Sequence, residues 1–397
     1  MKPRLIILLF AFCVAQNMKA QITSLGLVEE CDISSVDLKG AMRFVPELSF
    51  VDDYLYVATP KGLYRYLCDG SEESAGWEKL PLTDQLVLTF VVRDDTLIAL
   101  TRDELLVSLD GGMTTRSLPV EDVTDNGKKP LLGMAVHPHD ANKIFVSSEL
   151  KLMHTHDGGT TWKDICYDDG SPVLLTRLFY NPHDVNQLVG YYNKGYWPIA
   201  TSMRYSHNGG FEWNPVDVAV GGELWVTSYS ETYNIAFHPT MENRIILCGL
   251  CCYGISEDGG ASWTGIFNTE LNQLAANLTD IVYDKRNPDI LYGLGIRYSN
   301  SGITVIQRST DGGYTWEEIF NKTIAPKGHA ISFDMKDNLL ALYTGNGIYL
   351  LDVDAVDTSV SPIVNDENES TYYDIQGRKV AHPTRGIYIK DGRKVVF

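Results

Sequence analysis

The stretch that decides the fold is Ser309-Thr310-Asp311-Gly312-Gly313-Tyr314-Thr315-Trp316. Its form is Ser/Thr-x-Asp-x-Gly-x-Ser/Thr-Trp, and complete copies also begin at Ser256 and Thr155. Weaker copies begin at Ser206 and Ser108, so the start-to-start spacings are 47 to 53 residues. A nearly constant period of this length indicates one supersecondary unit that is repeated along the chain.

Each copy has the chemistry of a tight turn between two strands. The Asp side chain can accept hydrogen bonds from backbone N–H groups just after it, and the glycines adopt positive φ at little steric cost. Runs typical of β-strands lie on both sides of the last copy, at 303–307 and 315–319. We therefore expect a β-hairpin at each copy, with the Trp packed under the turn as an apolar anchor.

These copies resemble Asp-boxes, the repeats of the sialidase-type propeller superfamily. The resemblance identifies the structural box residues as Asp110, Asp157, Trp162, Asn208, Trp213, Asp258, Trp263, Asp311 and Trp316. It implies a fold but little about chemistry, because the same box occurs in enzymes and in non-enzymes.

Apolar strand patterns predict the rest of each repeat. Two strands precede each box hairpin, which gives four antiparallel strands and hence one propeller blade per repeat. Two more units lack a box: one covers 48–66 and closes at Trp77, and the other covers 330–350 with only three strands. The sequence therefore predicts an all-β, seven-bladed β-propeller, in which 22–28 supplies the missing strand and closes the ring. Among single-propeller families the chain is similar to the photosystem II assembly factor type, and one half of a xyloglucanase-type glycosidase is a comparable match.

The first twenty residues predict a secretory signal peptide. Lys2 and Arg4 precede an apolar run at 5–14, and Ala20 offers a cleavage point. The run is too short for a transmembrane span, and no other run approaches one, so no membrane insertion is expected. The predicted propeller domain then covers 21–357.

The C-terminal end departs from the repeat. A polar stretch at 358–371 predicts a linker, and 372–397 contains two hairpin-like pieces with turns at Gln376-Gly377 and Asp391-Gly392. This tail is similar to the C-terminal sorting tails (type A, type nine secretion) of Bacteroidetes surface proteins. The resemblance implies a secreted or cell-surface protein that uses an export machinery as a partner; a small β-hairpin packed on the propeller is the alternative.

Charge and cysteine content exclude some functions. The formal net charge is −18 and both ends of the chain are basic, so the body is more acidic still, which argues against a nucleic-acid partner. Cys248, Cys251 and Cys252 have metal-like spacing but no nearby His, so buried thiols or a local disulfide are favoured over a metal site. No metal and no cofactor are expected.

Ligands of propellers usually bind on the face built from the B-to-C and D-to-A connections, around the central channel. Two long loops on that face are rich in aromatic residues. The candidate ligand-binding residues are Tyr191, Tyr192, Tyr196, Trp197, Trp225, Tyr229, Arg297 and Tyr298. Such side chains can stack on sugar rings or grip a peptide, and they can equally pack the long loops onto the propeller.

Evidence for catalysis is weaker. A sialidase needs an arginine cluster and an Arg-Ile-Pro signature, whereas the chain has Arg43-Phe44-Val45-Pro46, with Arg204 and Arg297 in no family context. For another glycosidase, the candidate carboxylates are Glu223 with Asp168 or Asp169. A xyloglucanase-type enzyme uses two propellers, and one is predicted here.

The sequence therefore favours an exported, non-catalytic β-propeller that binds a glycan or protein ligand on its aromatic face. A glycoside hydrolase of the Asp-box superfamily is one alternative. An assembly or scaffold factor is the other.

Overall fold

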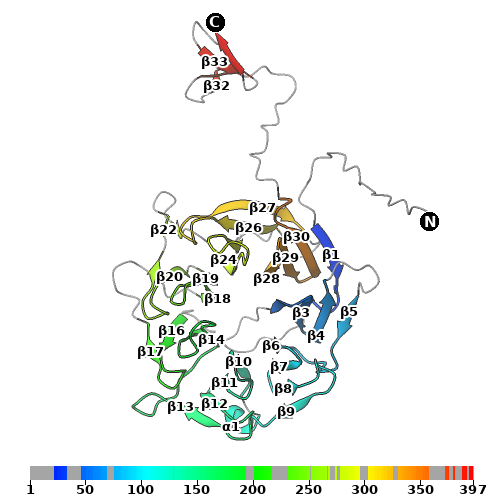
Figure 1. Cartoon of the computed structure of the whole chain (residues 1–397), viewed down its shortest axis with the longest axis vertical. Coiled ribbons are helices and arrows are strands. Elements are labelled where there is room, and N and C mark those ends of the chain that lie inside the picture. The colour runs from blue at the N-terminus through cyan, green and yellow to red at the C-terminus, as the bar shows by residue number, and fades with distance from the viewer. Residues whose placement is uncertain are drawn as a thin grey trace, which may run out of the picture. The chain divides into compact units, whose positions relative to one another are not determined.

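The computed structural model (Figure 1) contains two compact units, Met1–Val356 and Asp357–Phe397. The residues that it describes are 22–33, 46–68, 76–127, 129–193, 201–216, 231–250, 252–265, 267–268, 273–274, 278–295, 303–324, 330–356, 372–374, 379–380, 387–390 and 393–396. The predicted signal peptide (1–20) and linker (358–371) lie outside these residues.

The first unit is a seven-bladed β-propeller, which confirms the predicted fold (Figure 1). Each blade is a four-stranded antiparallel sheet whose strands, from the channel outward, are called A to D. Blades 1 to 3 consist of β2 (Leu48–Val51), β3 (Tyr54–Thr59), β4 (Gly62–Leu67), β5 (Trp77–Lys79); β6 (Thr89–Arg93), β7 (Thr96–Leu100), β8 (Leu105–Ser108), β9 (Arg116–Leu118); and β10 (Leu131–Val136), β11 (Ile144–Ser148), β12 (Leu152–Thr155), β13 (Lys163–Ile165). Blades 4 to 6 consist of β14 (Arg177–Tyr180), β15 (Leu188–Asn193), β16 (Thr201–Ser206), β17 (Asn214–Pro215); β18 (Glu231–Phe237), β19 (Ile245–Leu250), β20 (Cys252–Ser256), β21 (Thr264–Gly265); and β24 (Leu278–Tyr283), β25 (Leu291–Gly295), β26 (Ile303–Ser309), β27 (Glu317–Thr323).

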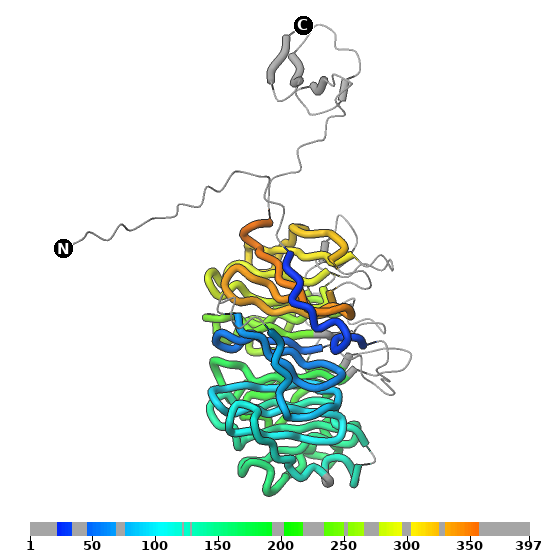
Figure 2. Tube along the Cα trace, turned by 90° about the vertical axis from the view of Figure 1, so that its right-hand side faces the viewer, coloured from blue at the N-terminus to red at the C-terminus, as the bar shows by residue number. Residues whose placement is uncertain are grey.

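Blade 7 takes its outer strand from the start of the propeller. Its strands are β28 (Ala330–Lys336), β29 (Leu339–Thr344), β30 (Gly347–Asp352) and β1 (Ile22–Gly26). β1 pairs antiparallel with β30, from Ile22 opposite Leu351, as predicted, and Figure 2 shows the two strands side by side. The Trp77 indole N–H of blade 1 donates to the Leu25 carbonyl at 2.7 Å, so β1 also ties blade 7 to blade 1.

The core is divided among the blade interfaces. Seven hydrophobic clusters are found among the described residues, one at each interface between neighbouring blades. The B strands lie between two clusters, and all five residues of β11 are therefore buried. Burial of apolar area at every interface stabilises the ring at roughly 25 cal/mol per Å².

Five C-to-D turns share one hydrogen-bond pattern, and we call them the Asx-Gly-Gly turns (108–115, 155–162, 206–213, 256–263 and 309–316), Asx being Asp or Asn. In all five, the first Ser or Thr hydroxyl donates to the Asx Oδ1 at 2.7–3.0 Å. The same oxygen accepts the backbone N–H four residues further on, at 2.8–2.9 Å. Both glycines of every turn have positive φ, which only glycine adopts readily.

The turns also hold neighbouring blades together. A Cβ on Gly313 of blade 6 would lie 2.7 Å from the hydroxyl of Tyr253 in blade 5, and that hydroxyl donates to the Gly313 carbonyl at 2.6 Å. The Trp316 indole packs beside the same tyrosine, with ring centroids 6.0 Å apart. The second glycine is thus required for close packing as well as for the turn.

At the same end of the blades as the Asx-Gly-Gly turns, the A strands turn into the B strands through short capped loops. The residues before the prolines act as caps: His238 Nδ1 accepts the Met241 N–H at 3.0 Å, and Asn181 Oδ1 accepts the His183 N–H at 2.9 Å. Asp284 has the same role in blade 6, where its Oδ1 accepts the Arg286 N–H at 2.8 Å.

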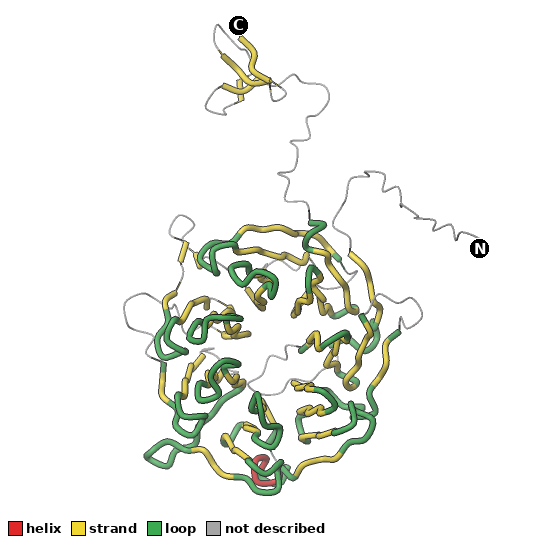
Figure 3. Tube along the Cα trace, viewed as in Figure 1, coloured by secondary structure: helices red, strands yellow, loops and turns green. Residues whose placement is uncertain are grey.

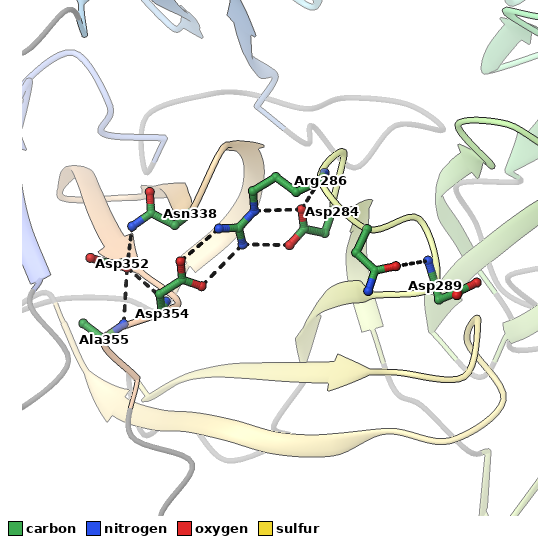
Figure 4. A network of polar contacts seen from close by, with 8 residues as sticks. Asp284, Arg286, Asp289, Asn338, Asp352, Asp354 and Ala355 are labelled. Atoms are coloured by element: carbon green, nitrogen blue, oxygen red, sulfur yellow. Dashed lines mark hydrogen bonds and ion pairs between the residues drawn. The ribbon is translucent and has the colours of Figure 1, made fainter.

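A polar network holds the end of blade 7 against blade 6 (Figure 4). The Arg286 guanidinium bonds Asp284 at 2.8 Å and reaches Asp354 at 2.9 Å. Asp352 caps the same segment by accepting the backbone N–H of Asp354 at 3.0 Å. The last turn of the propeller is thereby fixed just before the unit ends at Val356.

The remaining elements are small (Figure 3). They are α1 (Glu121–Thr124), the hairpin of β22 (Phe267–Asn268) and β23 (Gln273–Leu274), and the tail strands β31 (Tyr372–Asp374), β32 (Lys379–Val380), β33 (Ile387–Lys390) and β34 (Arg393–Val396). Both predicted tail hairpins form, and pairing of β31 with β33 joins them into one four-stranded sheet. Among the described residues there is no helix with the length and apolar character needed to cross a membrane.

Candidate functional site at the channel

The Asx-Gly-Gly turns provide a common register for the blades. In blade 2, for example, Leu106 lies two positions before Ser108, pairs with Ala99 of the B strand, and through it is aligned with Phe90 of the A strand. The same alignment applies to the other blades with such a turn, and the pairings of β2 and β28 extend it to blades 1 and 7. The residue just before the aligned A-strand residue occupies the same level of the channel in every blade. This set, called the channel ring, is Glu47, Thr89, Gly133, Arg177, Asn234, Asp280 and Ser332.

Two carboxylates connect consecutive blades: Asp280 of the channel ring, and Asp334, which lies two residues after the ring residue Ser332 on the same strand. Asp280 Oδ2 of blade 6 accepts the Phe333 N–H of blade 7 at 3.0 Å. Asp334 Oδ2 of blade 7 accepts the Phe50 N–H of blade 1 at 2.8 Å. In each case the donor lies one position further along the A strand of the next blade. The inner edge of an A strand has unpaired N–H groups, and these carboxylates satisfy some of them.

Glu47 of blade 1 follows the same geometry toward blade 2, where hydrogen bonds from Thr89 and the Phe90 backbone favour its charged form. It also meets Arg177 of blade 4, with 3.3 Å between Oε2 and Nη2. The Arg177 and Glu47 side chains are 22% and 28% exposed. This ion pair therefore reaches across the channel rather than around it.

Burial controls the charge of these groups. It raises the pKa of Asp280 to about 7, against hydrogen bonds from the Phe333 N–H and the Asn234 amide. Burial likewise raises the pKa of Glu47 and of Asp334. A cation close to the ring would favour the ionised carboxylates that burial disfavours.

The ring encloses a cavity of about 190 Å³, lined by Glu47, Arg177, Asn234, Asp280, Ser332 and Asp334 together with neighbouring A-strand residues. Ser332 is 4% exposed, and its hydroxyl has no hydrogen-bond partner among the described residues. A buried hydroxyl without a partner normally bonds to water or a ligand. The cavity is therefore polar and has unused hydrogen-bonding capacity.

The described candidates from the sequence do not converge on this cavity. Tyr191 is 1% exposed and belongs to the core cluster between blades 4 and 5, so it does not lie on an open aromatic face. Tyr192 is half-buried at the end of β15. Asp168 and Asp169 are exposed in a D-to-A connection, where Asp169 Oδ1 accepts the Ser171 N–H at 2.9 Å and caps its own turn.

The other candidates, Tyr196, Trp197, Glu223, Trp225, Tyr229, Arg297 and Tyr298, lie outside the described residues. In the sequence they fall between β15 and β16, between β17 and β18, and between β25 and β26. Their role in binding therefore stays a prediction.

Sequence reasoning missed the channel ring. All of its residues except Gly133 have polar side chains at or near the start of A strands, such as Arg177 before Leu178-Phe179 and Asp280 before Ile281-Val282. An alignment of the repeats on their Asx-Gly-Gly turns would have placed these A-strand positions in one column and so revealed them. The identification of Glu47 required the pairing of β2 with β3 in the structure, because blade 1 has no Asx-Gly-Gly turn.

Features of a sialidase or a metal site are not assembled by the described residues. The Arg204 guanidinium is bonded to Tyr167 Oη at 2.8 Å and to its own strand, and it does not line the channel cavity. Cys248 is buried in the core cluster between blades 5 and 6. No group of three His, Cys, Asp or Glu side chains within the described ranges could hold a metal ion.

No protein-family model matches the chain, and no curated protein matches it. Solved structures do match. The chain is similar to YCF48 in its complex with D1 peptide, at 15% identity and a TM-score of 0.55, over 80% of this chain and 95% of YCF48. At this identity the structural match shows a similar fold and nothing more.

Two enzymes have a similar fold. The GH74 enzyme of Niastella koreensis matches at 16% identity and a TM-score of 0.56, over 90% of this chain and 59% of the enzyme. The GH74 xyloglucanase of Xanthomonas campestris matches at 15% identity and a TM-score of 0.56, over 85% of this chain and 54% of the enzyme. The chain thus spans little more than half the length of these enzymes.

Proposed function

We propose that this protein is an exported, non-catalytic propeller whose channel face binds a segment of a protein partner. The observation that carries the proposal is the use of the channel carboxylates: Asp280 and Asp334 accept backbone N–H groups of the neighbouring blade. Carboxylates engaged in this way hold the ring together, which favours a structural over a catalytic role for them. Binding at this mouth is therefore better supported than catalysis.

Size and charge favour one basic side chain as the group that enters. A cavity of about 190 Å³ is smaller than the roughly 300–1,000 Å³ of ordinary small-molecule pockets, so it suits a side chain better than an oligosaccharide. Three carboxylates and one guanidinium line it, which leaves an acidic excess. YCF48, which has a similar fold, is seen with a peptide bound. A glycan held by the aromatic loops remains the second ligand class.

The test is a library of short peptides with a central Lys or Arg, paired with the same library carrying Gln there. The full-length protein is expected to prefer the basic members, and Glu47→Gln should weaken binding about tenfold. Asp164→Asn, at an exposed position of blade 3, is the matched control. Trp197→Ala and Trp225→Ala test the predicted loops in the same assay. Binding that is unchanged in all three channel-face variants would contradict the proposal, and selective binding on a glycan array would favour the second ligand class.

A glycoside hydrolase is the second candidate function, and one observation favours it. A carboxyl group with a pKa of about 7 that lies among other carboxyl groups can serve as a general acid. Turnover of an aryl-glycoside and xyloglucan panel that disappears in Asp280→Asn or Glu223→Gln would establish it. An assembly or scaffold role is a third candidate, for which a partner should co-purify in stoichiometric amount.

A further inference from the structure

A second cavity lies between blades 3 and 4, at the end of the blades that carries the A-to-B and Asx-Gly-Gly turns. This is the opposite end from the start of the A strands, so the cavity is distinct from the channel mouth. Its volume is about 440 Å³, within the usual range of small-molecule pockets. Six of the side chains that line it carry rings: His137, His154, His156, Trp162, Tyr180 and Phe211.

The charged side chains that line this cavity are basic, whereas the chain as a whole is acidic. Lys143 and Lys163 line it, and no Asp or Glu does so among the described residues, although the chain has a formal net charge of −18. Asp140 lies nearby, 3.5 Å from the Lys143 ammonium, outside the lining. A cavity with lysines and no carboxylate favours an anionic ligand.

Two of the three histidines that line the cavity offer hydrogen bonds that the described part of the protein does not use. His154 is 6% exposed and lines the cavity, and its imidazole makes no hydrogen bond with any described residue. Burial lowers its pKa to about 4, so the imidazole is neutral and has one donor and one acceptor nitrogen. His137 Nδ1 accepts the His139 N–H at 3.1 Å, which places the proton of its neutral form on Nε2 as a free donor.

Blade 4 departs from the common turn pattern at this cavity. Its turn has Asn208 where the other four have Asp, which removes a negative charge from the cavity wall. Asn208 Oδ1 is used within the turn, at 2.9 Å from the Glu212 N–H, and its amide N–H₂ has no acceptor among the described residues. The same turn presents Phe211, which is 48% exposed and contacts His154 edge-on with ring centroids 5.2 Å apart.

We propose that this cavity binds a carboxylate-bearing sugar residue, such as a uronic acid of an acidic glycan. The lysines pair with the carboxylate, and the apolar rings of Phe211 and Trp162 pack against the C–H face of the sugar. The neutral imidazoles, the Asn208 amide and the Thr161 hydroxyl match a ligand with several hydroxyl groups. A ligand without hydroxyl groups would leave the His154 nitrogens unsatisfied.

The test is calorimetric titration of the full-length protein with a galacturonate trimer and with the neutral galactose trimer. We expect the acidic trimer to bind at least about tenfold more tightly, with an affinity that falls as salt rises. Phe211→Ala and Lys163→Gln should each weaken binding about tenfold. Tyr314→Ala is the matched control, because Tyr314 occupies the same turn position in blade 6 and is 45% exposed.

Four results would overturn the proposal: no binding of the acidic trimer, equal binding of both trimers, an equal loss in Tyr314→Ala, or tighter binding of a triglutamate peptide. His154→Gln is measured with its melting temperature, so that a folding defect is recognised. Because Glu47→Gln lies at the channel, it should leave trimer binding unchanged. The cavity is thereby tested independently of the proposed function.

Discussion

Carboxylates at the Asx-Gly-Gly turns and carboxylates at the channel accept the same kind of hydrogen bond, but different burial shifts their pKa values in opposite directions. Asp110 in a turn accepts from Thr114, four residues away, and these hydrogen bonds lower its pKa to about 2. Asp280 in the channel accepts from Phe333, 53 residues away, and burial raises its pKa to about 7. Hydrogen bonds favour the charged carboxylate in both places, but burial inside the ring outweighs them and makes the charge of Asp280 costly.

The largest effect is expected from removing the channel carboxylate. Asp280→Ala deprives the Phe333 N–H, the Ile281 N–H and the Asn234 amide of their acceptor. Each buried donor without a partner costs about 1–3 kcal/mol, so we expect the free energy of unfolding to fall by ~2–4 kcal/mol in urea titrations. Asp311→Ala in a turn should cost less, because its donors are exposed and can bond to water. An equal loss of unfolding free energy in the two variants would contradict the proposed difference between channel and turn carboxylates.

The pH dependence should have opposite signs in the two regions. The pKa of Asp280 in the folded protein, about 7, lies above its ordinary value of 3.8, so between these values the folded state retains a proton that the unfolded state has released. Its contribution to stability is fully present below about pH 4 and is lost as the pH rises through 7. The contribution of Asp110, whose pKa is lowered, is present above its ordinary value and lost as the pH falls toward 2.

Asp280→Asn removes the titrating group and allows a direct measurement. We expect the wild-type free energy of unfolding to fall by ~1–3 kcal/mol more than that of the variant between pH 5 and pH 8. Urea titrations at both pH values give the difference. Parallel slopes in the two proteins would show that Asp280 does not titrate in this range.

Glycine substitutions separate the two requirements of the turns. Gly313→Ala adds a Cβ at φ +99° that would lie 2.7 Å from the Tyr253 hydroxyl and 2.9 Å from Ile246 Cδ1. Gly111→Ala adds one at φ +70° with no atom within 4 Å. We expect losses of ~2–3 kcal/mol and ~1 kcal/mol, because only the first combines backbone strain with overpacking between blades. Thermal unfolding of both variants provides the comparison, and equal losses would mean that strain alone decides.

The smallest effect is expected where a turn lacks its Trp. In blade 2 this position is Thr115, whose hydroxyl is buried without a partner among the described residues. Thr115→Val should raise the free energy of unfolding by up to ~1 kcal/mol, because it removes an unsatisfied polar atom at similar volume. Thr114→Val should lower stability, since the Thr114 hydroxyl bonds Asp110 at 2.6 Å. A destabilised Thr115→Val would indicate that the hydroxyl is satisfied.

Much of the fold could be predicted from the sequence. The Ser309–Asp311–Thr315 pattern specifies its own hydrogen bonds, and its spacing along the chain marks five of the seven blades. The strand 22–28 was predicted to close the ring because blade 7 lacked a fourth strand, and β1 occupies that place. By contrast, Tyr191 was predicted on an open face, because alternation in a strand does not tell which side faces the neighbouring blade.

The sequence alone determined the repeat, the turns and the number of blades, because each of these depends on residues within a few positions of one another. Only the tertiary structure decided that Glu47 and Arg177 meet, since they are 130 residues apart and lie on opposite blades. It also decided that His154 and Phe211, on neighbouring blades, line one cavity. Contacts of this kind exist only after ring closure brings distant A strands and turns together, so no local pattern of residues encodes them.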